Sequence, residues 1–111
     1  MAGKFEIKTA KDGQFYFNLK AGNGEVILTS QMYKAKSGAL NGAESVRSNS
    51  GDDTLYERKV SSSDKPFFTI KAKNHQTIGK SGFYSSAAAM EKGIESVKKS
   101  APEAKVVEVL E

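Results

Sequence analysis

The sequence predicts an α+β fold built from two tandem units, each holding three β-strands and one helix. When the chain is shifted by 51 residues it aligns with itself without a gap, and 13 of 45 aligned residues are identical. Within each unit, stretches of alternating apolar and polar residues precede one stretch of helical periodicity. We expect repeat 1 at about 3–50, repeat 2 at about 54–101 and a tail at 102–111, all within a single domain, 1–111.

Alternation of apolar and polar residues predicts three strands in each repeat, and tight turns make each set an antiparallel meander. Asp12-Gly13 and Asn23-Gly24 are such turns in repeat 1. In repeat 2 the second turn is Asn74-His75, and we expect Asn74 to accept the left-handed conformation. Pro66 suits the start of a strand or an edge. The expected strands are 4–9, 14–20, 26–29, 56–60, 67–71 and 77–80.

One helix is expected after Tyr33 and one after Tyr84. Ser85 or Ser86 can cap the second, and the first should end with a left-handed residue near 49–51. Apolar spacing predicts that both helices lie on a sheet. The expected buried positions are Lys36, Ala39, Ala43 and Val46 in the first helix, and Ala87, Met90, Ile94 and Val97 in the second.

Two glycines, Gly42 and Gly93, occupy equivalent positions in the middle of the two helices. Glycine there costs about 1 kcal/mol relative to alanine. We therefore expect each helix to approach the sheet or the other helix closely at its glycine. The tail segment 104–110 is apolar and β-branched and can add an edge strand or trail, and Leu110-Glu111 can be a cloning remnant.

The composition indicates a globular protein of mildly basic charge. Lysine and arginine number 17 against 13 acids, a net charge of +4 that solubility alone can explain. The sequence has no cysteine, which excludes disulfides and thiolate chemistry, and shows neither a signal peptide nor a stretch long enough to span a membrane. We expect a cytoplasmic monomer with no membrane partner.

Several motifs resemble the YegP-like family of small bacterial proteins. They are Lys20 to Glu25 with Ile27 to Ser30, Lys71 to Gln76 with Ile78-Gly79, and the two Gly-x-x-Ser-Val helix segments. The resemblance covers about residues 3–102. It implies a two-layer sandwich of tandem ββ(β)α repeats, pseudo-twofold symmetric, with an antiparallel sheet and both helices on one face. It implies no catalytic residues.

Enzyme chemistry finds little support in the sequence. His75 is the lone histidine and lies in a turn without a nucleophile or orienting acid at a useful spacing. Gly79-Lys80-Ser81 lacks the earlier glycine of a phosphate-binding loop. We interpret Asp52-Asp53 beside Glu57 as a solvated connector rather than a cation site. We expect Glu6 and Glu57 to form surface ion pairs with neighbouring lysines. We expect no enzyme, no cofactor and no metal.

The candidate binding surface is the sheet face opposite the helices. Strand parity places two aromatic residues among four lysines there, an arrangement similar to a base-stacking platform. Ordinary cross-strand packing over lysine stems explains the same pattern. The residues are Lys8, Tyr16, Asn18, Lys20, Lys59, Phe67, Thr69 and Lys71.

The sequence thus favours a small non-enzymatic binding or interaction module of unknown function. A protein partner and weak binding of single-stranded nucleic acid or a nucleotide through this face both remain open. A low-turnover enzyme acting on an anionic substrate is the further alternative.

Overall fold

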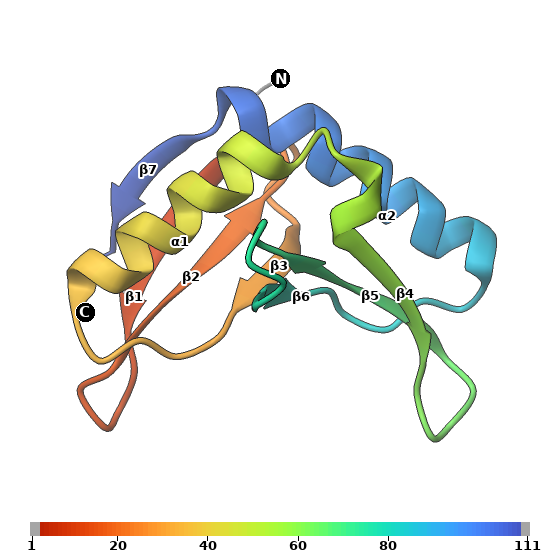
Figure 1. The fold of residues 1–111 in the computed structure, drawn as a ribbon, viewed down its shortest axis with the longest axis horizontal. Helices are drawn as coiled ribbons and strands as arrows, with labels where there is room; N and C mark the ends of the chain where they lie inside the picture. The colour runs from red at the N-terminus through yellow and green to blue at the C-terminus, as the bar shows by residue number, and fades with distance from the viewer. Residues whose placement is uncertain (1–2, 110–111) are drawn as a thin grey trace.

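The computed structural model describes residues 3–109. These residues form seven strands and two α-helices, with short 3-10 helices at Asp53–Leu55 and Ala101–Glu103. Figure 1 shows both helices on one side of a single sheet, so the α+β two-layer prediction is confirmed. The elements are β1 (Lys4–Thr9), β2 (Phe15–Lys20), β3 (Val26–Ser30), α1 (Lys36–Asn49), β4 (Tyr56–Val60), β5 (Pro66–Lys71), β6 (Thr77–Lys80), α2 (Ala87–Ser100) and β7 (Lys105–Glu108).

The strand order in the sheet is β4-β5-β6-β3-β2-β1-β7. All neighbours are antiparallel except β1 and β7, which are parallel. The expected antiparallel pairing therefore holds for the six strands of the two repeats, and β7 departs from it because the tail runs back from α2 beside β1. The tail adds β7 as an edge strand. Leu110-Glu111, which the sequence suggested could be a cloning remnant, lies outside the described residues.

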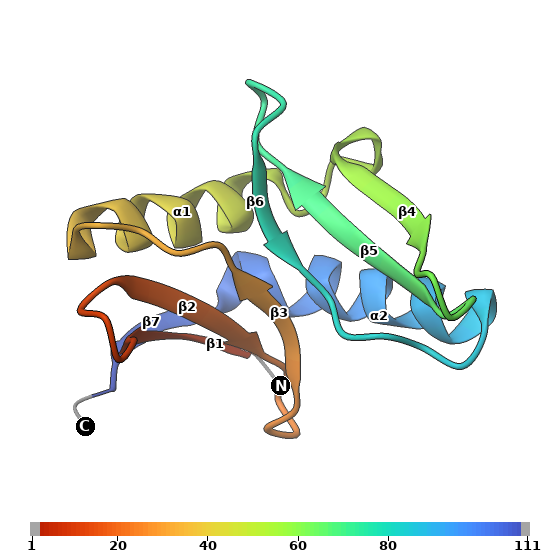
Figure 2. The same cartoon turned by 90° about the horizontal axis from the view of Figure 1, so that it is seen from below.

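The two repeats join at the centre of the sheet through β3 and β6. Their ladder is short, pairing Thr29 with Lys80 and Ser30 with Gly79. Each helix contacts strands of its own repeat and also the central strand of the other, α1 reaching β6 and α2 reaching β3. Figure 2 shows the two halves of the sheet meeting at β3 and β6.

Four hairpin turns use a left-handed residue. Gly13 and Gly24 supply it in repeat 1, with φ of 85° and 88°. In repeat 2 Asp64 and His75 take the same conformation, with φ of 61° and 68°. The expectation that Asn74 would do so is wrong: its side chain instead accepts a hydrogen bond from the backbone of residue 76.

A bulge interrupts each repeat's inner strand pair at the same place. Ile27 is the extra residue opposite Leu19 and Lys20, and Ile78 is its counterpart in repeat 2. A bulge sets two residues against one and bends the strand. Ile27 and its neighbour Leu28 are consequently both buried, where strict alternation would expose one of them.

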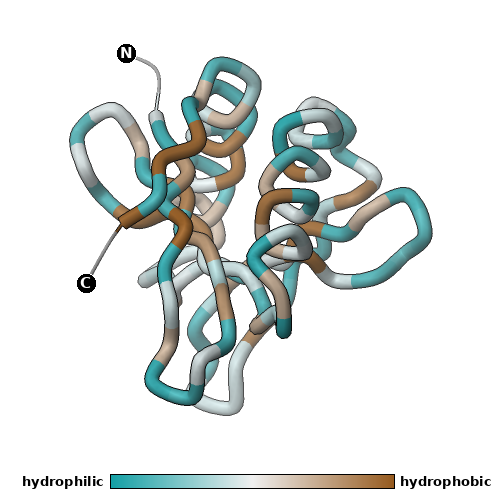
Figure 3. Tube along the Cα trace, turned by 90° about the vertical axis from the view of Figure 1, so that its left-hand side faces the viewer, coloured by the Kyte–Doolittle hydropathy of each residue, from teal (hydrophilic) through white to brown (hydrophobic). Residues whose placement is uncertain are grey.

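The core lies between the helices and the sheet. Figure 3 shows hydrophobic residues gathered where helices and strands face one another, and hydrophilic ones at the turns. Ala39, Ala43 and Val46 are buried in α1, and Met90, Ile94 and Val97 in α2. Lys36 and Ala87 are exposed, so these two predicted core positions are wrong: each lies in the first turn of its helix, before the first buried residue of that helix, which is Ala39 in α1 and Met90 in α2.

The start of α2 is capped as the sequence predicts, whereas the end of α1 is not. The Ser86 hydroxyl accepts a hydrogen bond from the backbone of Ala89 at 3.1 Å, as expected for the cap of α2. No residue of 49–51 has a positive φ, so the expected left-handed cap of α1 is absent. The chain continues instead through Ser50, in a helical conformation, into the connector.

The mid-helix glycines are explained by two tyrosines. A Cβ atom at Gly42 would meet the hydroxyl of Tyr33, and one at Gly93 the hydroxyl of Tyr84. Rings of the sheet, including Phe68, lie just beyond. The expected close approach is therefore present, and it is made to the tyrosine before each helix and the sheet beneath it.

Candidate functional site

The eight predicted site residues lie on the helix-free face, meaning the strand side chains opposite both helices. Cross-strand partners share a face, and the registers pair Lys8 with Tyr16 and Lys59 with Phe67. Alternate residues Phe17 and Phe68 are fully buried towards the helices. Both predicted aromatic rings therefore point away from the helices.

In repeat 1 the lysines of this face surround one glutamate. Glu6 is only 7% exposed, and its carboxylate lies 3.0 Å from the ammonium of Lys20, 3.4 Å from that of Lys4 and 3.9 Å from that of Lys8. The hydrogen bond from Lys20 lowers the pKa of the Glu6 carboxyl, and desolvation of the carboxylate raises it by a smaller amount. The pKa of Glu6 therefore lies below its ordinary value. The expectation of a surface ion pair is thus wrong in one respect, because this carboxylate is buried.

Repeat 2 carries the equivalent arrangement in a more open form. The Glu57 carboxylate lies 3.0 Å from the Lys71 ammonium and 3.5 Å from that of Lys59. The hydrogen bond from Lys71 lowers the pKa of Glu57. A single carboxylate offsets one positive charge, so each cluster keeps an excess of lysine.

The helix-free face carries more net positive charge than the whole chain. The registers add Lys80 and Lys105 to it, through Thr69 and Lys4 respectively. Its seven lysines against two glutamates give +5, whereas the whole chain has +4. The remainder of the chain is therefore close to neutral. The seven lysines are Lys4, Lys8, Lys20, Lys59, Lys71, Lys80 and Lys105.

An aromatic cluster lies at one side of this face. The rings of Phe67 and Phe83 meet edge to face with centroids 5.5 Å apart. The Lys80 ammonium lies 4.9 Å from the centroid of Phe67 and 5.3 Å from that of Phe83. Phe83 is 55% exposed. We name Phe67, Phe83 and Lys80 the aromatic cluster.

Sequence reasoning missed Phe83 and Lys80 as members of the face. Lys80 could have been placed by extending strand parity to β6. Phe83 follows the end of β6, where alternation no longer applies, and only its contacts with Phe67 and Lys80 place it. Its counterpart in repeat 1 is Met32, which is 52% exposed.

Two of the predicted site residues are largely unavailable to a ligand. Asn18 is 8% exposed, and its side-chain oxygen accepts a hydrogen bond from Thr29 at 2.9 Å. Thr69 is 5% exposed and donates to Glu57 at 3.4 Å. Both therefore contribute to the internal structure of the face, and its accessible residues are the lysines and aromatic rings.

The alternative chemical motifs have structural roles. The Ser81 hydroxyl accepts from the backbone N–H of Phe68 at 2.9 Å and donates to the carbonyl of Gly82, so it is unavailable to a phosphate. Asp53 lies 3.0 Å from Arg58 and 2.9 Å from Lys98, and hydrogen bonds from these two lower its pKa to about 2. Within residues 3–109, no group of three or more histidine, cysteine or acidic side chains is placed to hold a metal.

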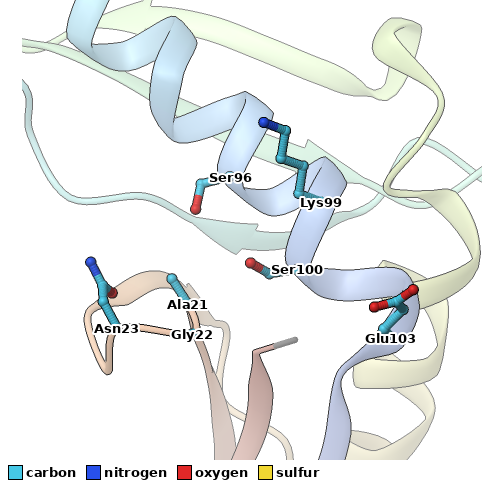
Figure 4. Close-up of a pocket in the computed structure, with 7 residues that line it drawn as sticks. All are labelled: Ala21, Gly22, Asn23, Ser96, Lys99, Ser100 and Glu103. Atoms are coloured by element: carbon cyan, nitrogen blue, oxygen red, sulfur yellow. The ribbon is translucent and has the colours of Figure 1, made fainter. Parts of the chain in front are cut away.

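One hollow lies away from the helix-free face. It is open, measures about 500 Å³ and separates the β2–β3 turn from the end of α2; Asn23 on the turn faces Ser96 and Ser100 across it (Figure 4). An equivalent hollow of about 330 Å³ lies between Asn74 and Ser45 in the other half. Both asparagines accept backbone hydrogen bonds within their turns, so both are used to shape the hairpins.

The chain matches a known family over nearly all of the described residues. A family model described as a domain of unknown function, DUF1508, matches residues 10–57 and again residues 61–108. Each match spans two strands and a helix; the second continues through β7, and the first ends two residues into β4. The chain belongs to this family. The double match confirms the tandem repeat, and the resemblance to YegP-like proteins is confirmed as well.

Relatives and solved structures carry the same architecture. The chain is 61% identical over 98 residues to a UPF0339 protein of Acinetobacter baylyi, covering 88% of each chain. It is 59% identical over 109 residues to a UPF0339 protein encoded in the ptx operon 5′ region of Stutzerimonas stutzeri, covering 98% of each. The NMR structure of YegP from Escherichia coli superposes with a TM-score of 0.92 at 49% identity, over 97% of this chain and 93% of that one.

A second NMR structure, of protein SO3888 from Shewanella oneidensis, gives a TM-score of 0.91 at 49% identity, over 97% of this chain and 92% of the other. The descriptions of the family and of these relatives name no activity. Among the described residues, neither helix combines the length and apolar character that a membrane span requires.

Proposed function

We propose that this family member is a binding module without catalytic activity, and that its helix-free face is the contact surface for an anionic polymer. The charge distribution carries the proposal. The face has seven lysines and two glutamates, and the rest of the chain is close to neutral. A surface of one sign attracts partners of the opposite sign and accelerates their encounter.

The described titratable groups support a non-catalytic role. A general acid near neutral pH needs a raised carboxyl pKa. Every carboxyl pKa with a resolved shift is lowered instead, by lysine, arginine or a turn hydrogen bond, which keeps the group ionised. These groups are Glu6, Asp52, Asp53, Glu57 and Glu91.

The shape of the face also favours a polymer or another large partner. Two hollows lie at the turn–helix junctions and one at the β1–β7 edge, and a fourth, of about 200 Å³, includes Lys4 alone among the lysines of the face. The lysines themselves spread over six strands of the sheet. Binding should be of modest affinity because Glu6 and Glu57 already engage five of the seven lysines. A monomeric, cytoplasmic module belongs to the same proposal and rests on the repeat's shared core and the cysteine-free sequence.

Titration of the isotopically labelled chain with inorganic polyphosphate, followed by NMR, tests the proposal. We expect saturable shifts on β1, β2, β5 and β6, weakened about ten- to hundred-fold between about 50 and 200 mM salt. Lys59→Gln with Lys80→Gln should weaken binding. Lys92→Gln with Lys99→Gln removes the same charge from α2 and should leave binding nearly unchanged. Equal losses in the two double variants would refute a specific surface.

A further inference from the structure

We infer that the anionic polymer is single-stranded nucleic acid, and that the aromatic cluster of repeat 2 is where a base stacks. The inference rests on the proposed function, since it names the partner of the same face. Phe67, Phe83 and Lys80 carry it. None of the three is required by the hydrophobic core between the helices and the sheet.

The first step is the exposure of Phe83. A phenylalanine that is 55% exposed keeps much of its apolar ring in water, which is unfavourable by the hydrophobic effect. Its edge-to-face contact with Phe67 favours one orientation of the ring and leaves much of the ring exposed. A flat ring held in a fixed orientation at the surface is suited to stacking with a nucleobase, which gains contact without further ordering of the side chain.

The second step is the ammonium beside the rings. Lys80 lies within 5.3 Å of both ring centroids and is exposed. A base stacked on Phe83 would bring its own phosphate near this charge, because base and phosphate are joined through one sugar. Five of the seven lysines of the face are engaged by Glu6 or Glu57, whereas Lys80 contacts only the rings among its described interactions.

The third step is the choice among polyanions. Polyphosphate, or an acidic peptide without aromatic side chains, matches the lysines but has no flat ring for Phe83. A duplex hides the faces of its bases, so its phosphates alone would contact the lysines. Single-stranded nucleic acid presents both groups, and bare sheet faces with aromatic side chains are a recurrent way to bind it.

The fourth step is the asymmetry of the two repeats. In repeat 1 the positions of Phe67, Phe83 and Lys80 are Tyr16, Met32 and Thr29. Only the first of these offers an aromatic ring, and none offers a cation. The principal stacking site is therefore in repeat 2. Tyr16 lies three strand spacings away across the sheet and about four residues away along the strands, roughly 20 Å in all by standard strand geometry, a distance that several nucleotides of one bound strand span.

The experiment measures fluorescence anisotropy of a labelled oligothymidylate of about 12 nucleotides. The competitors are a duplex of the same length and inorganic polyphosphate. We expect the oligothymidylate to bind more tightly than either competitor. Its log affinity should fall with log salt with a slope no steeper than about −3.5, the limit for five net charges. Phe83→Ala should weaken it at least about five-fold.

Matched variants separate stacking from charge and from folding. Met32→Ala changes the equivalent exposed position of repeat 1 and should alter oligothymidylate affinity less than about two-fold. Phe83→Ala should leave polyphosphate binding unchanged. Phe83 projects from the surface, so its variant should retain the NMR spectrum of the folded chain.

The outcomes distinguish this inference from the proposed function. Oligothymidylate binding that Phe83→Ala leaves intact, or a duplex or polyphosphate bound as tightly as the oligothymidylate, overturns base stacking while the anionic contact surface stands. A chain that binds none of the three probes at low salt overturns both.

Discussion

The hydroxyl of Tyr84 occupies the space that a Cβ atom of residue 93 would need, so Gly93 in the middle of α2 is required by a contact. The ring carbon bearing that hydroxyl lies 2.6 Å from the same Cβ position. Tyr33 and Gly42 repeat the relationship in α1. The two helices are thus each fitted to the tyrosine that precedes them.

The first prediction is that Gly93→Ala destabilises the chain. Alanine improves helix propensity by about 1 kcal/mol, but overpacking against Tyr84 costs about 1–3 kcal/mol. We expect a net loss of about 1 kcal/mol in urea unfolding, partly recovered by adding Tyr84→Phe. Gly82→Ala, where a Cβ would meet open space, should change stability by less than about 0.5 kcal/mol. A Gly93→Ala variant as stable as the parent would contradict the contact.

The second prediction concerns Ser81. Its buried hydroxyl accepts a hydrogen bond from the backbone N–H of Phe68, which is itself fully buried. Ser81→Ala should therefore lower the free energy of unfolding by about 1–3 kcal/mol, and Ser30→Ala by a similar amount. Thermal and urea unfolding measure the loss. The exposed Ser62→Ala is the control, and a Ser81 variant indistinguishable from it would show that the hydroxyl is dispensable.

The third prediction is a pH dependence set by Glu6. Its native pKa lies below the ordinary value of 4.5, so ionisation stabilises the fold above that pH and the gain is lost as pH falls through the native pKa. Glu6→Gln should be less stable than the parent at pH 7, and the difference should shrink steadily below about pH 4.5. Urea unfolding across this range gives the difference. A difference in the free energy of unfolding between the two proteins that stays constant down to pH 3 would contradict the prediction.

The fourth prediction is that repeat 1 does not fold alone. In the intact chain β3 pairs with β6, and Ala101, Ala104 and Val106 from the end of the chain complete the core over β1 and α1. Residues 1–52 should accordingly be unfolded or dimeric by NMR and sedimentation. A stable monomer with a dispersed spectrum would show that the repeats are independent domains.

The fifth prediction is that His75→Gly stabilises the chain. His75 holds a φ of 68°, a conformation that disfavours residues with a Cβ. Glycine should recover about 0.5–1 kcal/mol in thermal unfolding, after allowing for its freer unfolded state. Gly24→Ala, at the equivalent turn with φ of 88°, should have the opposite effect. If both substitutions changed the stability in the same direction, the left-handed conformation would not be what disfavours a side chain at these turns.

Local patterns predicted the elements well. Alternation located the first six strands to within one residue, and helical spacing identified Ala43, Val46, Ile94 and Val97 as core residues. Sequence patterns failed to predict burial where the exposure of a residue depends on what packs around its helix or strand. Ala87 has the correct helical phase, but it is the first residue of α2 and its side chain is exposed.

For the candidate site too, the sequence predicted the direction of side chains but not their contacts with neighbouring strands. Parity placed Tyr16 and Phe67 on the helix-free face because side-chain direction alternates along a strand. Parity could not show that Asn18 is hydrogen-bonded and buried, since that depends on Thr29 from the neighbouring strand.

The sequence by itself determined the duplication, the six meander strands, the two helices and the face on which each strand residue lies, because these follow from local periodicity and turn chemistry. Only the tertiary structure decided the parallel pairing of β7 with β1, the tyrosine beneath each mid-helix glycine, the burial of Glu6 among three lysines and the meeting of Phe67 with Phe83. Each of these depends on strand register and on the packing of segments distant in the chain, which no local pattern encodes.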